Sequence, residues 1–198
     1  MRAFLLVAAC LVALTAVSGD AQAAGHIYLL RGFANIFSTG MDTLAEELVS
    51  RGYKATVHSA GESDTLATEA ANLQKSGKGP IIIVGHSLGA DAAISMAEKM
   101  KDLGARVALI VAFGPTYNES APSNVARIIN YYQASSIVNA KIVKGPGFNG
   151  SISNINLDAS SDITHFNIEK NSRLHTKTIA YIAMIAGRGK EIHATPLQ

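Results

Sequence analysis

Short runs of consecutive apolar residues alternate along the chain with longer segments in which apolar residues recur every three or four positions. Runs of the first kind predict buried strands, and segments of the second kind predict amphipathic helices. We therefore expect helices at residues 41–50, 65–75, 88–101 and 172–185. We expect strands at residues 26–30, 55–58, 80–84, 107–113, 127–132 and 152–157.

The order of these elements predicts the fold class. Strands and helices take turns along the chain, and the strand at residues 80–84 is apolar throughout, which is typical of a strand buried on both faces. Because parallel neighbours need crossover connections, this order favours a three-layer α/β/α sandwich with a mostly parallel sheet. Ligands of such folds bind beyond the carboxyl ends of the strands, so we expect any chemistry there.

The first residues follow a different pattern. Met1 and Arg2 precede an apolar run at residues 3–17, and the small residues Ala21 and Ala23 stand where a signal peptidase would cut after residue 23. The competing interpretation is a membrane anchor, but the run is shorter than the ~20 residues that a helix needs to span a bilayer. We therefore expect a signal peptide at residues 1–23, a mature domain at 24–198 without a membrane span, and a periplasmic or secreted location.

Composition narrows the possible chemistry. The 198 residues suit one domain, and a net charge of +2 with no basic run makes nucleic acid an unexpected partner. The one cysteine, Cys10, lies in the predicted signal peptide. The mature domain is then left without disulfides, thiolate nucleophiles or cysteine-bound zinc, so serine, histidine and carboxylates are the candidate reactive groups.

One sequence motif indicates a specific reaction. Residues 85–89 read Gly-His-Ser-Leu-Gly, directly after the apolar strand and directly before a predicted helix. This is the pattern of a nucleophile elbow, a sharp turn that exposes the hydroxyl of Ser87 and aims the first amides of the helix at a developing oxyanion. The amide of Leu88 is the expected oxyanion donor. The alternative is a Gly-Ser-Gly helix start without chemical meaning.

With this motif in its strand–turn–helix context, the chain resembles the α/β-hydrolase family, in particular its small lipase-like and thioesterase-like members. The resemblance spans nearly all of residues 24–198 and includes Arg-Gly-Phe at residues 31–33, which is similar to the family's second oxyanion segment. It implies Phe33, or else Ala34, as the second donor. It also implies the chain order nucleophile, acid, histidine.

That order places the general base late in the chain. His165 follows the last predicted strand and precedes the last helix, and it is preferred to His175, which we expect on the surface or in packing. The remaining histidines fit the role poorly: His26, His58, His86 and His193.

The acid is not fixed by the sequence. No carboxylate follows directly the strands at residues 107–113 and 127–132, where the family carries it. Asp158 is the first choice because it stands at a strand end, followed by Asp162 and Glu119. The two aspartates can equally be solvated loop residues without a catalytic role.

We therefore expect a serine hydrolase that cleaves small-molecule carboxylic esters or thioesters without a metal or organic cofactor. Residues 114–126 are too few, and too interrupted by Pro115 and Pro122, to hold a helical lid, which favours short acyl chains. Two alternatives stay open. One is an α/β-hydrolase-fold binding module that has lost its acid, and the other is an acyltransferase with the same serine and histidine.

Overall fold

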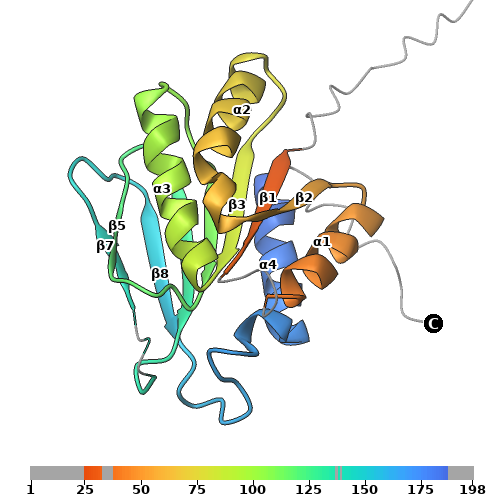
Figure 1. The fold of residues 1–198 in the computed structure, drawn as a ribbon, viewed down its shortest axis with the longest axis vertical. Helices are drawn as coiled ribbons and strands as arrows, with labels where there is room; N and C mark the ends of the chain where they lie inside the picture. The colour runs from red at the N-terminus through yellow and green to blue at the C-terminus, as the bar shows by residue number, and fades with distance from the viewer. Residues whose placement is uncertain (1–24, 33–37, 137, 139, 187–198) are drawn as a thin grey trace, which may run out of the picture.

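The computed structural model describes residues 25–32, 38–136, 138 and 140–186. Its centre is a six-stranded sheet in the order β2-β1-β3-β4-β6-β8, and every neighbouring pair is parallel (Figure 1). The strands are β1 (His26–Arg31), β2 (Lys54–Ser59), β3 (Ile81–His86), β4 (Leu109–Phe113), β6 (Arg127–Tyr132) and β8 (Ser151–Asn156). The predicted signal peptide lies outside the described residues.

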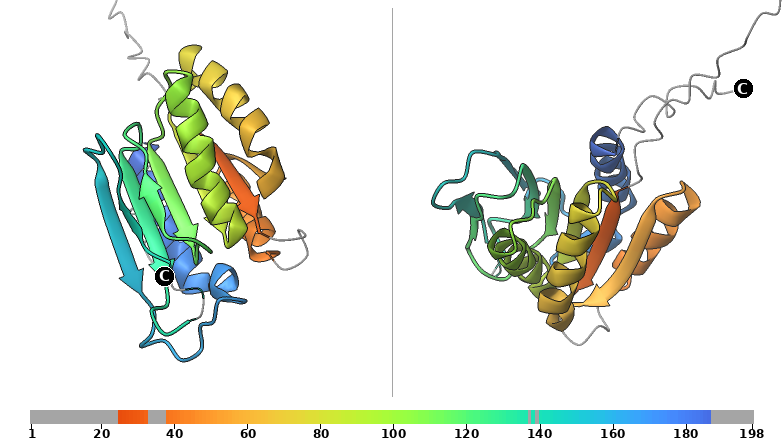
Figure 2. Two further views of the ribbon diagram at one scale, coloured as in Figure 1. Left: turned by 60° about the vertical axis from the view of Figure 1, so that its left-hand side comes forward. Right: turned by 90° about the horizontal axis from the view of Figure 1, so that it is seen from above.

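Helices cover both faces of this sheet. The helices are α1 (Gly40–Ser50), α2 (Ser63–Lys75), α3 (Leu88–Asp102) and α4 (Ser172–Ile185), with short 3₁₀ turns η1 (Ala60–Glu62) and η2 (Ile168–Lys170). Figure 2 shows α2 and α3 on one face of the sheet, and α1 and α4 on the other. The predicted three-layer α/β/α sandwich is thereby confirmed.

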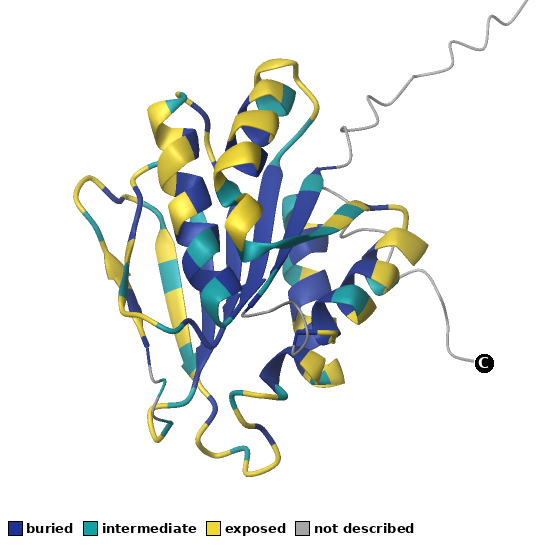
Figure 3. Ribbon diagram, in the orientation of Figure 1, coloured by how far each residue is buried: buried dark blue, intermediate teal, exposed yellow. Residues whose placement is uncertain are grey.

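The apolar run of β3 follows from these two layers. Ile81 and Ile83 pack into the cluster beneath α2 and α3, whereas Ile82 and Val84 pack into the cluster beneath α1 and α4. All four side chains are fully buried. A strand covered on both faces has no solvent side, so its sequence shows no polar alternation. Edge strand β8 is the contrast, with exposed positions along its length (Figure 3).

Two short strands were not expected from the sequence. β5 (Glu119–Ala121) and β7 (Ile142–Lys144) form a separate parallel pair. The side chain of Asn154 holds β7 against the main sheet, because its amide donates to Ile142 O at 2.9 Å and its Oδ1 accepts from Ile142 N at 3.1 Å. Three-residue strands of mixed polarity leave no periodic signal.

The fold brings several loops to one edge of the sheet. The segments that follow β1, β3, β4 and β8 all leave from the carboxyl ends of parallel strands. Residues 114–126, all described, contain β5 but no helix, as expected for a site without an inserted lid. No helix in the described parts of the chain is long and apolar enough to cross a membrane.

Candidate active site

The turn between β3 and α3 presents Ser87 in a strained conformation. Its φ of 54° and ψ of −128° lie where residues with a Cβ are rare, and no other non-glycine residue among those described has a positive φ. The turn leaves the side chain partly exposed between a buried strand and the first turn of a helix. This is the geometry that the Gly-x-Ser-x-Gly pattern predicts.

The two flanking glycines allow this turn to form. A Cβ on Gly85 would overlap the carbonyl of Gly89, and a Cβ on Gly89 would overlap the carbonyl of Leu30 in β1. Strand, turn and helix therefore approach one another closely enough that no side chain fits at either position. The motif spacing is a packing requirement of the elbow itself.

His165 lies beside the serine. Its Nε2 is 3.1 Å from Ser87 Oγ, so the hydroxyl can donate to this nitrogen when the ring proton is on Nδ1. The loop that carries the histidine is anchored at several points. Gln133 donates to Ile163 O at 2.7 Å, and Asn167 Oδ1 accepts from Thr164 N at 2.6 Å. The arrangement is a serine and a base within hydrogen-bonding distance.

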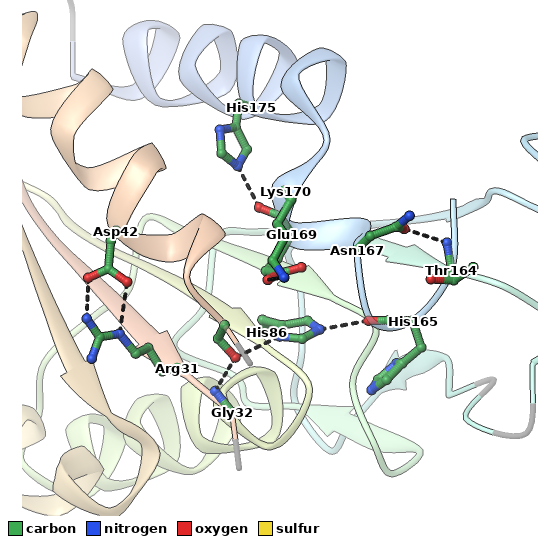
Figure 4. A network of polar contacts seen from close by, with 11 residues as sticks. Arg31, Gly32, Asp42, His86, Thr164, His165, Asn167, Glu169, Lys170 and His175 are labelled. Atoms are coloured by element: carbon green, nitrogen blue, oxygen red, sulfur yellow. Dashed lines mark hydrogen bonds and ion pairs between the residues drawn. The ribbon is translucent and has the colours of Figure 1, made fainter. Parts of the chain in front are cut away.

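His86 connects the parts of this site. Its Nε2 donates to the carbonyl of His165 at 3.0 Å, and its Nδ1 accepts from Ser38 Oγ at 2.9 Å. Ser38 Oγ in turn accepts from Gly32 N at 2.9 Å (Figure 4). Burial lowers the pKa of His86 to about 4, so the ring is neutral and can donate through one nitrogen while it accepts at the other. His86 thus ties the end of β1 to the loop of His165.

The other histidines lie elsewhere. His175 is buried, and its ring nitrogens contact Glu169 O at 2.6 Å and Glu47 Oε1 at 3.2 Å, which fastens α4 to α1 and η2. It is a packing residue, one of the two roles expected for it. His26 and His58 lie on β1 and β2, and His193 is outside the described residues.

The structure does not bring the predicted acids to His165. The exposed carboxylate of Asp158 accepts from Ser135 Oγ at 2.8 Å and from Ser135 N at 3.1 Å, and these bonds lower its pKa. Asp162 pairs with Arg173 at 3.0 Å. Glu119 lies on β5, where burial raises its pKa. Within the described residues, no hydrogen bond joins a carboxylate to Nδ1 of His165.

Gly114 explains why the strand end beside His165 carries no acid. It follows β4 directly and has a φ of 58°. A Cβ at this position would lie 2.9 Å from Nδ1 of His165, closer than such atoms normally approach. The imidazole therefore packs against the backbone of Gly114, in space that an acidic side chain at residue 114 would need.

Two residues near the serine were missed by the sequence analysis. Asp91, one turn into α3, is 8% exposed, and its carboxylate accepts from Thr116 N at 3.0 and 3.1 Å and from Tyr117 N at 3.2 Å. Thr116 Oγ1 is 3.5 Å from Ser87 Oγ. The available signal was a carboxylate four residues after the nucleophile, among small residues of a helix that packs on the sheet.

The electrostatics of the pair follow from its surroundings. Burial lowers the pKa of His165, and the negative charge of Asp91 partly opposes this by raising it. Burial raises the pKa of Asp91, while the hydrogen bonds from Thr116 and Tyr117 act in the opposite direction. The base is thus held neutral at neutral pH, with a buried carboxyl group as its electrostatic partner.

Of the predicted oxyanion donors, the structure describes Leu88. Leu88 is the first residue of α3, so its amide is one of the helix-start N–H groups that have no partner within a helix. Phe33 and Ala34 lie outside the described residues. Before Phe33 in the chain, an ion pair between Arg31 and Asp42 joins the end of β1 to α1 (Figure 4). No group of acidic, histidine or cysteine side chains in the described parts could hold a metal ion.

A parallel sheet between helical layers, with a strained serine at the turn after a central strand, is the architecture of the α/β-hydrolase fold. Similar solved structures include a candidate hydrolase of the alpha/beta superfamily from Xanthomonas campestris pv. campestris, with 12% identity, a TM-score of 0.41, and coverage of 79% of this chain and 99% of that one. An acetylxylan esterase has 12% identity, a TM-score of 0.48, and coverage of 83% and 99%. No family model and no curated protein matches the sequence.

Proposed function

We propose that the chain is a serine hydrolase that cleaves carboxylic esters or thioesters through an acyl-enzyme. The observation that carries the proposal is Ser87 in a strained elbow with Nε2 of His165 3.1 Å from its Oγ. A positive φ at a non-glycine residue costs stability and persists where the surrounding structure enforces it, which is common at active sites. The signal-like residues 1–23 support an exported enzyme.

The proposed mechanism uses this pair twice. Ser87 Oγ attacks the acyl carbon while its proton moves to Nε2 of His165, and the tetrahedral oxyanion faces the amide of Leu88. Collapse of that intermediate breaks the bond to the leaving alcohol or thiol, which takes the proton from His165. Water then attacks the acyl-enzyme and gives a proton to His165, and collapse of the second intermediate breaks the bond to Ser87 Oγ, which takes that proton back from His165 as the carboxylic acid leaves.

Labelling with a fluorophosphonate tests the proposal, because this reagent phosphonylates serines activated by a base. We expect wild-type protein to be labelled and Ser87→Ala not to be labelled. Ser76→Ala is the matched control, since Ser76 is an exposed serine at the end of α2 whose hydroxyl donates to Asn72 O. The same samples should hydrolyse a short-chain aryl ester in the same order. An unlabelled wild-type protein would contradict the proposal.

One observation favours a second function, a binding module that has lost catalysis. It is the absence, within the described residues, of a carboxylate hydrogen-bonded to His165. Such a module would retain an acyl ligand but would neither react with a fluorophosphonate nor turn over esters. The labelling experiment therefore separates the two functions.

The pH dependence of the reaction gives a further prediction. The base must be neutral to accept the proton of Ser87, and burial lowers the pKa of His165 from 6.5. We therefore expect kcat/KM to rise with pH through an apparent pKa below 6.5 and to stay level above it. Initial rates with a soluble aryl ester between about pH 4 and 9 measure this profile. An apparent pKa above 6.5 would show that burial does not dominate.

A further inference from the structure

Proton transfer within the Ser87–His165 pair requires a negative charge nearby. Proton transfer from Ser87 creates a positive imidazolium, which a buried site stabilises poorly without a nearby negative charge. A hydrogen-bonded acid normally supplies that charge, but here Nδ1 of His165 faces the backbone of Gly114. The sequence-predicted Asp158 and Asp162 bind Ser135 and Arg173 instead. The negative charge that stabilises the imidazolium of His165 must therefore come from a different residue.

Asp91 is a buried residue of α3, and its carboxylate binds the loop that contacts both members of the pair. It accepts two amide hydrogens of that loop, from Thr116 and Tyr117. The same loop places Thr116 Oγ1 3.5 Å from Ser87 Oγ and Gly114 against the ring of His165. One carboxylate therefore fixes the segment on which both the nucleophile and the base rest.

Burial raises the pKa of Asp91, but two features of its position oppose this rise by stabilising the ionised carboxylate. It lies in the first turn of α3, where the helix dipole stabilises a negative charge, and its two oxygens are held by backbone amides. The backbone amide of Asp91 also donates to Ser87 O at 3.3 Å, so Asp91 and Ser87 lie on the same first turn of α3. A preorganised carboxylate of this kind needs no rearrangement when the imidazolium forms.

We propose that Asp91 is a positioning residue that takes the place of the triad acid. It holds the 114–117 loop against Ser87 and His165, and its charge stabilises the imidazolium across that loop instead of through a hydrogen bond to Nδ1. This inference rests on the proposed function. It assigns to the helix after the elbow the role that the resemblance places at a later strand end.

The charged and titratable groups around this assembly agree with the assignment. Asp91 raises the pKa of His165 against the effect of burial, and His165 lowers that of Asp91. His86, from β3, has a pKa lowered to about 4 and is neutral near pH 7. Glu119, on β5, has a pKa raised by burial and then by the negative charges of Asp91 and Glu98. Asp91 is thus the group that keeps the pKa of His165 from falling further.

The decisive variant is Asp91→Asn, which keeps the shape and one acceptor oxygen but removes the charge. We expect kcat to fall on the order of 10- to 100-fold, since the charge acts across a loop in a partly buried site. We expect KM to change little and the apparent pKa of kcat/KM to move to lower pH. A purely structural role would not move that pKa. Asp91→Glu restores the charge and is expected to restore the wild-type pKa.

Asp64→Asn is the matched control, because Asp64 occupies the first turn of the neighbouring helix α2 and is exposed. It should leave kcat and the pH profile unchanged.

Thr116→Val removes the hydroxyl beside Ser87 but keeps the carboxylate of Asp91. It should therefore lower kcat without shifting the apparent pKa of kcat/KM, and Thr116→Ser should restore the rate. These threonine variants keep the proposal testable if Asp91→Asn does not fold.

The outcomes separate this inference from the proposed function. A wild-type protein that is neither labelled nor active contradicts the proposed function itself. An active wild type whose rate and pH profile survive Asp91→Asn, or whose kcat survives Thr116→Val, overturns the role of Asp91. If Asp158→Asn instead lowers kcat and shifts the profile, the acid is Asp158 and the inference is wrong.

Discussion

The His165→Ala variant is expected to lose on the order of 10⁴- to 10⁶-fold in kcat for ester hydrolysis while keeping its fold. The imidazole accepts the proton of Ser87 at a distance of 3.1 Å, and no other histidine among the described residues contacts that oxygen. A neutral hydroxyl without a base is a poor nucleophile, so the remaining rate should come from the oxyanion donors and from binding. Steady-state kinetics and a thermal melt of the same samples measure both quantities.

A double variant makes this prediction sharper. Groups that act as one unit are not additive, so Ser87→Ala combined with His165→Ala should be no slower than either single variant. His58→Ala is the control, because His58 lies on β2 and bonds to Thr56, away from the site. A double variant that multiplies the two single losses would show that serine and histidine act independently.

The architecture could be predicted because its signals are local. β3 and β4 are continuously apolar since both of their faces are covered, and α3 shows the helical period between them. These elements were placed to within about two residues. β5 and β7 could not be predicted, because strands of three residues leave no periodic signal and β7 is held to the main sheet by the side chain of Asn154 from a distant strand.

The candidate site also has a part that could be predicted from the sequence and a part that could not. The glycine spacing around Ser87 predicts the elbow, because each glycine marks a backbone approach within the motif or with β1. Asp91 and Thr116 could not be paired from sequence, since they lie on different elements and meet only after β4 returns beside β3. The place of Asp158 at a strand end favours it as the acid, yet in the structure its carboxylate binds Ser135.

The elbow also predicts a large loss of stability in Gly89→Ala. On helix propensity alone, alanine inside α3 would be more stable than glycine by about 1 kcal/mol. Here the added Cβ would overlap the carbonyl of Leu30, a fully buried residue of β1. Relief requires α3 to move away from the central sheet, and overpacking of this kind costs up to about 3 kcal/mol and occasionally more. The clash therefore outweighs the propensity.

We expect the melting temperature of Gly89→Ala to fall by roughly 6 to 12 °C, or the variant to be isolated unfolded. Gly61→Ala is the matched control, because the nearest atom to its added Cβ would be Ser59 Oγ at 3.8 Å. This control should melt at or slightly above the wild-type temperature, since alanine narrows the unfolded ensemble. If Gly89→Ala melted like Gly61→Ala, β1 and α3 could not lie as close as the structure places them. The elbow that presents Ser87 depends on that approach.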